Sequence, residues 1–186
     1  MAAPHRIRIV GGRHRGRLIP VPDAPGLRPT PDRVRETLFN WLGQDLTGAR
    51  TIDLYAGTGA LTLEALSRGA ALAVAVDRNP ALVRALVACA KRIGELPLET
   101  HVDDAMRFLS REARRFDVAF LDPPFADDPW DALLGAIAPR MNAGGFVYAE
   151  AGRSLAPPRG WELVRHARAG SVHYHLLAIN EAALRA

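Results

Sequence analysis

The sequence predicts an α/β protein with a mainly parallel, doubly wound sheet, and three observations support this fold class. From residue 50 onward, short apolar runs alternate with stretches whose apolar residues recur at helical spacing. Such alternation is typical of a parallel sheet covered by helices on both faces. The last two apolar runs, 161–164 and 172–179, have no helical stretch between them, so an antiparallel hairpin is expected there. The length of 186 residues fits one sizeable core.

The N-terminal residues predict a basic β-hairpin followed by a linker. Residues 6–21 contain two short β runs around Gly11 and Gly12. Residues 22–29 contain three prolines and Gly26, which is typical of an irregular segment. We therefore expect a small N-terminal arm over residues 1–29 and a main domain over residues 30–186.

The main domain is expected to begin with a helix. Thr30 has the side chain of a helix N-cap, and Pro31 suits the first helical position. Val34, Leu38 and Trp41 then recur at helical spacing. The strand candidates that follow are 51–55, 72–76, 98–102, 117–121 and 145–150, and the helix candidates between them are 59–68, 79–94, 105–113 and 129–139.

Positive charge is concentrated near the N-terminus. The chain has 24 Lys and Arg, of which only Lys91 is a lysine, and a net charge of +4. Residues 1–35 hold eight Arg against Asp23 and Asp32, so this segment carries +6 and the remainder −2. A merely Arg-rich composition would spread Arg evenly along the chain. The clustering therefore indicates a partner that carries phosphate groups.

The sequence favours a cytoplasmic protein without a membrane span. No stretch approaches the roughly 18 consecutive apolar residues that a membrane span requires. The first residues lack the apolar stretch of a secretory signal. The single Cys89 cannot form an internal disulfide, and it falls on the apolar side of its helix, where a buried thiol is expected.

A glycine loop follows the first strand of the main domain. In the segment DLYAGTGALTLEAL, residues 53–66, Gly57 and Gly59 let a ligand approach the main chain closely. A dinucleotide-binding fingerprint requires a third glycine where this chain has Thr62, and a phosphate-binding P-loop requires a lysine that this segment lacks. S-adenosylmethionine is the third option, because its methionine moiety can lie along such a loop.

Acidic residues follow the next two strands. Asp77 stands 20 residues after Gly57 at a strand end, where a carboxylate can accept hydrogen bonds from ribose hydroxyls. Asp103 and Asp104 follow the third strand, where a carboxylate can cap the next helix and accept from an adenine amino group. Each feature alone is more often structural. Their order on successive strand ends favours a cofactor site.

The fourth strand ends in LDPPF, residues 121–125, at the same edge of the sheet. The prolines remove backbone donors, so Asp122 and a nearby carbonyl can hold both hydrogens of an exocyclic amino group. Phe125 offers a ring on which a base can stack. Hydrogen bonds to an amino nitrogen that becomes positive favour the transition state. The alternative is structural: Asp-Pro-Pro ends the strand and Phe125 fills a core.

With these motifs, the chain resembles the class I S-adenosylmethionine-dependent methyltransferases, and more narrowly the RsmD-type family that methylates guanine N2 in 16S ribosomal RNA. The segments that carry the resemblance are RIVGGRHRGRLIPVP, LRPTPDRVRETLFNWL, DLYAGTGALTLEALSRGA and LDPPF. The resemblance implies a Rossmann-like methyltransferase domain with S-adenosylmethionine as cofactor. It also implies 16S ribosomal RNA as the partner, within a 30S subunit or an assembly intermediate.

The resemblance implies roles for individual residues as well. The target guanine would be held by Asp122, Pro123, Pro124 and Phe125. The cofactor would be bound by Asp53, Tyr55, Gly57, Gly59, Asp77, Asp104, Arg28 and Thr30, with Asp103 competing with Asp104 for the adenine. RNA phosphates would be held by Arg6, Arg8, Arg13, Arg15 and Arg17.

Other functions remain open at the level of sequence. One is the same chemistry on an adenine N6 or a transfer-RNA guanine, and another is a ribosome assembly factor without catalysis. A nicotinamide oxidoreductase is the third, which Thr62 disfavours. No metal site is expected: His173 and His175 share a strand face, but no Cys or carboxylate stands at ligand spacing.

Overall fold

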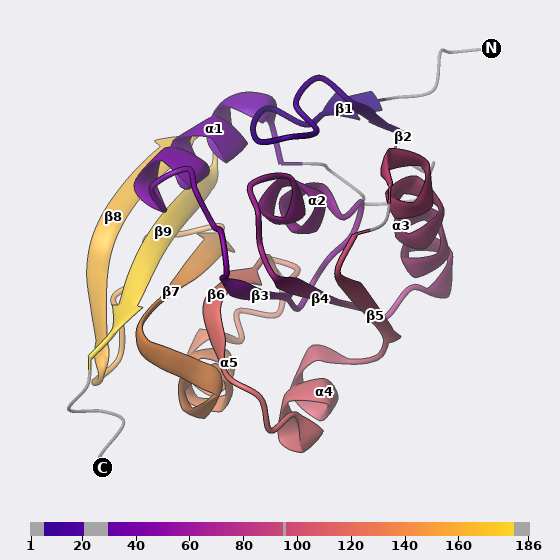
Figure 1. Ribbon diagram of the computed structural model, residues 1–186. Helices are drawn as coiled ribbons and strands as arrows, with labels where there is room; N and C mark the ends of the chain where they lie inside the picture. Colours follow the sequence, from indigo (N-terminus) through magenta and orange to yellow (C-terminus); the bar gives the residue numbers. More distant parts are fainter. Residues whose placement is uncertain (1–5, 21–29, 95, 181–186) are drawn as a thin grey trace.

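The structure is a computed structural model that describes residues 6–20, 30–94 and 96–180. Its centre is a sheet with the strand order β5-β4-β3-β6-β7-β9-β8 (Figure 1). The strands are β3 (Arg50–Asp53), β4 (Leu72–Asp77), β5 (Leu98–Val102), β6 (Phe116–Leu121), β7 (Met141–Ala151), β8 (Trp161–Ala169) and β9 (Val172–Ile179). Strands β3 to β7 pair in parallel, and β9 pairs antiparallel with β7 and β8. The predicted sheet and its C-terminal hairpin are confirmed.

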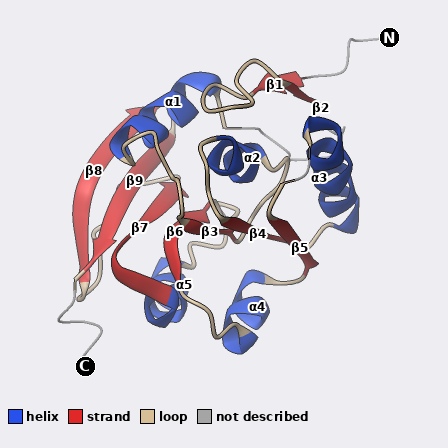
Figure 2. Ribbon diagram, viewed as in Figure 1, coloured by secondary structure: helices blue, strands red, loops and turns tan. Residues whose placement is uncertain are grey.

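Helices cover both faces of the sheet (Figure 2). One face carries α1 (Asp32–Trp41), α2 (Ala60–Ser67) and α3 (Pro80–Ile93), and the other carries α4 (Ala105–Arg111) and α5 (Trp130–Ile137), which leads into the 3-10 helix η1 (Ala138–Arg140). Side chains alternate along β6: Val118 and Phe120 pack with α1 and α2, whereas Ala119 and Leu121 pack with α4 and α5. The sheet is therefore doubly wound, as predicted.

The predicted strands and helices of the main domain are present, with small shifts at their ends. β5 has the predicted bounds. The largest differences are in β8, which ends at Ala169 rather than at residue 164, and in β7, which begins at Met141 rather than at residue 145. The first part of β7 pairs irregularly with β6, through a register shift between Phe116 and Val118. Because Gly144 and Gly145 form a pair that is typical of a turn, the sequence did not predict that the strand extends through them. None of the helices formed by the described residues has the length and apolarity of a membrane span.

The start of α1 corrects one prediction. The N-cap is Pro31, and its carbonyl accepts from the N–H groups of Val34 and Arg35. Thr30 was expected to cap this helix, which is wrong. Its hydroxyl instead donates to Glu150 on β7 at 3.1 Å, because a buried carboxylate lies within its reach. Thr30 therefore fastens the start of the helix to the sheet.

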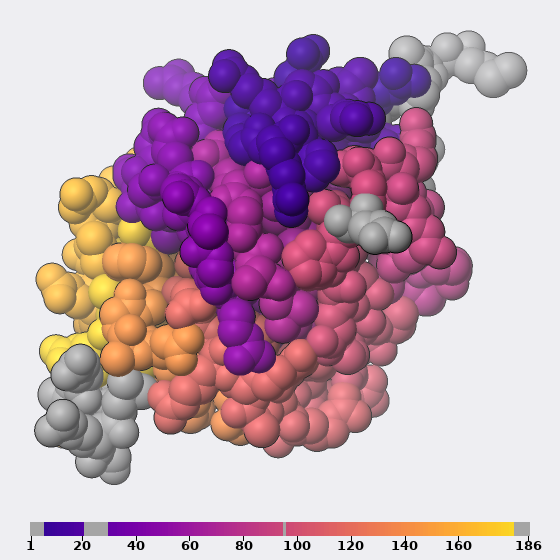
Figure 3. Space-filling model, viewed as in Figure 1, coloured from indigo at the N-terminus to yellow at the C-terminus, as the bar shows by residue number. Residues whose placement is uncertain are grey.

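The N-terminal residues form the predicted hairpin, in which β1 (Arg6–Arg8) pairs antiparallel with β2 (Leu18–Pro20). Ile7, Ile9 and Ile19 are buried in a cluster with residues of α2 and α3. In the space-filling view the indigo atoms of this hairpin lie directly over the main domain (Figure 3). The hairpin is therefore packed on the domain. The predicted linker, residues 22–29, lies outside the described residues.

Backbone contacts fix the hairpin loop to α2. The Arg13 N–H donates to the Ser67 carbonyl at 2.8 Å, and the Val10 N–H donates to Glu64 Oε2 at 2.9 Å. Gly12 has φ +70°, and a Cβ added there would lie 1.9 Å from the Ser67 carbonyl oxygen. Only glycine fits this close approach. Glu64 is buried and forms an ion pair with Arg68 at 3.0 Å, so its charge is compensated.

Candidate active site

Five acidic residues lie at the edge of the sheet where the parallel strands end. Asp53 and Asp77 are the last residues of β3 and β4, Asp104 and Asp122 follow β5 and β6, and Glu150 lies near the end of β7. Ligands bind beyond the carboxyl ends of strands in doubly wound sheets. The structure thus brings the predicted acidic residues to one edge. Glu150 was not singled out from the sequence, although an acid at the end of an apolar strand repeats the pattern of Asp53 and Asp77.

The glycine loop crosses this edge between β3 and α2. Gly57 (φ 53°) and Gly59 (φ 76°) both have left-handed backbone conformations, which favour glycine. The Gly57 N–H donates to Asp77 Oδ2 at 2.8 Å, and Asp77 Oδ1 accepts from the Asn79 N–H at 2.8 Å. Asp77 therefore joins the loop to the end of β4. Tyr55 lies half-buried at the start of the loop, and burial raises the pKa of its phenol.

Asp53 lies beneath the loop and is buried. Its Oδ2 accepts a hydrogen bond from the Thr62 hydroxyl at 2.8 Å. Burial raises the pKa of Asp53 to about 7, although the hydrogen bond from Thr62 opposes the shift. Thr62 stands where a dinucleotide fingerprint has glycine, so the departure from that fingerprint has a structural purpose here. It links β3 to α2.

A cavity of about 370 Å³ lies at the ends of β4 and β5, lined by Arg78, Val102, Asp103, Asp104 and Arg107. Asp104 caps α4 by accepting from the Arg107 N–H at 3.0 Å and forms an ion pair with Arg78. These contacts hold the pKa of Asp104 below its usual range. Asp103 is more buried and forms ion pairs with the guanidinium groups of Arg107 and Arg111.

The residues around this cavity and the glycine loop fit S-adenosylmethionine. Val102 is 51% exposed and offers an apolar surface to a purine ring. Asp104, more exposed than Asp103, can accept from an amino group, and Asp77 can accept from hydroxyls. The donor and acceptor set therefore matches the adenine and ribose of this cofactor.

The LDPPF motif lies beside these groups, after β6. Phe125 is 46% exposed, so the alternative in which it fills a core is wrong. Its ring packs over Gly152, where an added Cβ would lie 3.4 Å from the ring. A cavity of about 300 Å³ opens there, lined by Pro123, Pro124, Phe125, Asp128, Pro129, Trp130, Gly152 and Arg153. Trp130 is buried at the start of α5.

The carboxyl group of Asp122 has an unusual environment. Within the described part of the chain, no donor forms a hydrogen bond with it. Burial, and then the neighbouring carboxyl groups of Glu150 and Asp53, raise the pKa of Asp122 well above its usual range. Glu150 is 6% exposed and accepts from the Tyr148 hydroxyl at 2.8 Å as well as from Thr30. Burial raises its pKa too.

The predicted RNA-binding arginines lie on the surface of the hairpin. Arg6, Arg8, Arg13, Arg15 and Arg17 are exposed, and among the described residues none of them has an acidic ion-pair partner. Their guanidinium groups are available to phosphates. Arg28, predicted to lie over the cofactor, is outside the described residues.

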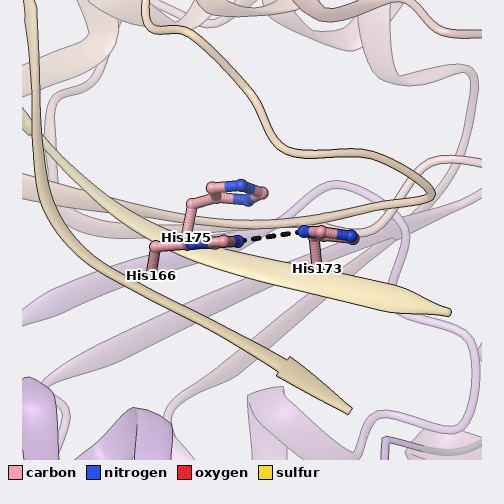
Figure 4. A group of neighbouring side chains, drawn as sticks. All are labelled: His166, His173 and His175. Carbon is pink, nitrogen blue, oxygen red and sulfur yellow. Dashed lines mark hydrogen bonds between the residues drawn. The ribbon is translucent and has the colours of Figure 1, made fainter. Parts of the chain in front are cut away.

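Three histidines, His166, His173 and His175, cluster on the C-terminal hairpin (Figure 4). His166 Nε2 and His173 Nδ1 are hydrogen-bonded at 3.0 Å. His175 is buried, accepts from the Leu155 N–H at 3.1 Å and donates to the Ala149 carbonyl at 3.2 Å. Burial lowers its pKa to about 4. A metal ligand needs a free ring lone pair, and both nitrogens of His175 are engaged, so the contacts assign it a structural role.

Comparisons with known proteins identify the family of this chain. The family model described as Conserved hypothetical protein 95 matches residues 7–178. A protein of Escherichia coli strain K12 named ribosomal RNA small subunit methyltransferase D is 39% identical over 92% of this chain and 89% of its own length. A Bacillus subtilis protein named putative rRNA methyltransferase YlbH is 35% identical over 82% of this chain and 86% of its own.

A solved structure shares the fold across nearly the whole chain. The putative methyltransferase yhhF from Escherichia coli superposes with a TM-score of 0.85 at 36% identity, covering 95% of this chain and 99% of its own. The match includes the N-terminal hairpin region and the C-terminal strands. The chain therefore belongs to the family described as Conserved hypothetical protein 95, the RsmD family of S-adenosylmethionine-dependent methyltransferases.

Proposed function

We propose that the protein transfers a methyl group from S-adenosylmethionine to the exocyclic N2 amino group of a guanine in 16S ribosomal RNA. One observation carries this proposal: LDPPF stands beside the glycine loop, in a chain 39% identical to a protein named ribosomal RNA small subunit methyltransferase D. The name of that relative supports the RNA and the subunit. The motif supports an amino group as the methyl acceptor.

Different residues would bind different parts of the cofactor. Gly57, Gly59 and Tyr55 would hold the methionine part, Asp77 the ribose and Asp104 the adenine, with Asp53 ordering the loop from below. Bound S-adenosylmethionine would supply the methyl group of its sulfonium to the amino nitrogen, with the electron pair of the broken carbon–sulfur bond remaining on sulfur. The amino proton would pass to Asp122 or to water. Thr30 and Arg28 belong to the segment that would border the cofactor and the reaction centre.

The LDPPF residues would hold the acceptor base. Asp122 in its ionised form would accept a hydrogen bond from the guanine amino group, and the Pro123 or Pro124 carbonyl would accept the other. The exposed ring of Phe125 would stack on the base, an interaction worth about 1–3 kcal/mol. The guanine must leave its stack to reach this position. Positioning of the amino nitrogen then supplies most of the catalysis.

The hairpin would bind RNA phosphates through Arg6, Arg8, Arg13, Arg15 and Arg17. Such an arm is small, so we propose a 30S subunit or an assembly intermediate as the substrate, in which other proteins help to present the guanine. Ribosomal RNA as substrate requires that the enzyme act in the cytoplasm.

The test is to incubate the purified protein with methyl-labelled S-adenosylmethionine and, separately, unmodified 30S subunits, free 16S RNA, transfer RNA and DNA. Each product is digested and the labelled nucleoside identified. The proposal predicts N2-methylguanosine from the ribosomal samples. Labelled N6-methyladenosine, or label only in transfer RNA, would retain the chemistry and refute the target. Cofactor binding without transfer to any substrate would support an assembly factor instead.

A further inference from the structure

Glu150 is a buried acid to which the proposed function assigns no role. A carboxyl group in an apolar interior is costly unless its environment compensates the charge. No Lys, Arg or His among the described residues forms an ion pair with Glu150. Its compensation consists of two hydroxyl donors, Tyr148 at 2.8 Å and Thr30 at 3.1 Å. Both bonds end on Oε1, so Oε2 has no hydrogen-bond donor within the described residues.

The sheet places Glu150 beside Asp122. In the parallel pairing of β6 with β7, Phe120 is opposite Tyr148 and Leu121 is opposite Ala149. Asp122 and Glu150 are the next residues on the two strands, so continuing the register sets them side by side with their side chains on the same face. That face is the one covered by α1 and α2, where Phe120 and Tyr148 are buried.

Glu150 is also connected to the N-terminal hairpin. Thr30, which donates to Glu150, offers its carbonyl to the guanidinium of Arg35. Arg35 is buried, donates to the Arg8 carbonyl of β1 and pairs with Asp32 at 2.8 Å. A continuous set of hydrogen bonds therefore runs from the backbone of the proposed RNA-binding hairpin, through the start of α1, to the carboxyl group next to Asp122.

We propose that Glu150 is a positioning residue for methyl transfer: held by Tyr148 and Thr30, it sets the orientation and the charge of the Asp122 carboxyl group that meets the acceptor amine. This proposal rests on the proposed amino methyl transfer. It assigns Glu150 no contact with the substrate, and its effect acts through Asp122.

The proposal has a consequence for pH dependence. A negative charge on Glu150 disfavours a second negative charge on Asp122, and the raised pKa of Asp122 agrees with this effect. Because Asp122 must be ionised to accept from the amine, activity is lost as the pH falls through its pKa. The other groups that face Glu150 are Tyr148 on its own strand, Asp53 on β3, Tyr174 opposite it on β9 and Arg35 of α1, which is reached through Thr30.

The first experiment compares Glu150→Gln with the wild type in pH profiles of kcat and KM for 30S subunits, between about pH 5 and pH 9. Removing the neighbouring charge lowers the pKa of Asp122, so the acid-side midpoint of kcat moves to lower pH by about 1 unit. The matched control is Glu162→Gln, an exposed glutamate on β8, which leaves the midpoint in place. Glu150→Asp keeps the charge, and its midpoint stays near that of the wild type. A uniform loss of kcat at every pH, with an unchanged midpoint, would show that Glu150 only supports the fold.

The second experiment needs neither RNA nor a variant of Glu150. The carboxyl carbons of aspartate are isotope-labelled in the wild type, and Asp122 is followed by NMR as the pH changes, with Asp122→Asn identifying its signal. The account predicts a titration in two steps, shared with Glu150. A single step near the ordinary value of about 3.9 overturns the proposal. Because this readout involves no methyl transfer, failure of the proposed function leaves it interpretable.

Discussion

The carboxyl groups on the two sides of the sheet edge have contrasting surroundings. Toward β4 and β5, Asp77 accepts from two backbone N–H groups, and Asp104 accepts from a helix N-terminus and pairs with Arg78. Toward β6 and β7, the half-buried Asp122 lies next to the buried Glu150, and neither has a cation paired to it among the described residues. Fixed donors surround the first pair, and those around Asp104 hold its pKa below its usual range. The second pair resists full ionisation.

This difference separates a binding role from a reactive one. A carboxylate that fixed donors hold in place can accept hydrogen bonds from hydroxyls and amino groups of a cofactor. A carboxyl group with a raised pKa gains and loses its proton at a pH nearer to neutrality. Its charge can therefore change during a reaction. The four residues are of similar type, and the strand ends on which they stand give them different chemistry.

The largest expected effect comes from removing the carboxyl group on the β6 side. Asp122→Ala deletes the acceptor of an amino group whose charge grows in the transition state, so kcat falls by about 100- to 1000-fold. The dissociation constant for S-adenosylmethionine, measured by calorimetry, stays near that of the wild type. Equal losses in kcat and in cofactor affinity would show that Asp122, like Asp77, acts in cofactor binding, and the two sides of the sheet edge would then not differ in role.

A smaller effect is expected on the β4 side. Asp77→Ala removes hydrogen bonds to a charged acceptor and releases the Gly57 N–H, so cofactor affinity weakens by about 10- to 100-fold. The matched control is Asp131→Ala, an exposed aspartate in the first turn of α5, with unchanged affinity. If Asp77→Ala bound the cofactor like the wild type, Asp77 would have no role in the site.

Asp53 gives a prediction for stability. Its pKa is about 7 in the folded protein and close to 3.8 when unfolded, so the folded state binds the extra proton between these values. Stability from this group is present below pH 4 and is lost as the pH rises through 7, by about 4 kcal/mol in total, since one pKa unit corresponds to roughly 1.4 kcal/mol. Asp53→Asn cannot lose this proton. The free energy of unfolding of Asp53→Asn, measured by urea titration, should therefore increase relative to that of the wild type between about pH 5 and pH 8. A difference that does not change with pH would contradict the raised pKa.

The sequence predicted the elements better than it predicted their contacts. Both ends of β5 could be predicted, because its apolar end residues, Leu98 and Val102, and the flanking Pro97 and Asp103 are local signals. The hydrogen bond between Thr30 and Glu150 joins residues 120 positions apart, and no local pattern encodes it. The same limit explains the wrong assignment of Thr30 as a helix cap. The acidic strand ends could be predicted because the order of parallel strands brings their carboxyl ends together.

The smallest effect concerns the hairpin. Arg15→Ala removes one exposed charge that has no ion-pair partner among the described residues, so RNA affinity falls by about two- to fivefold and its salt dependence weakens. Arg159→Ala, an exposed arginine before β8, is the matched control. Binding assays at two salt concentrations distinguish them. Equal effects of the two variants would assign RNA binding to overall charge rather than to the hairpin.

The most direct test of the division between the two sides is a single-turnover assay of methyl transfer with 30S subunits at saturating S-adenosylmethionine. The account predicts that Asp77→Ala recovers nearly the wild-type rate once the cofactor saturates it, whereas Asp122→Ala remains slow at every cofactor concentration. A rate for Asp122→Ala that rises to the wild-type value, or one for Asp77→Ala that stays slow at saturation, would contradict it.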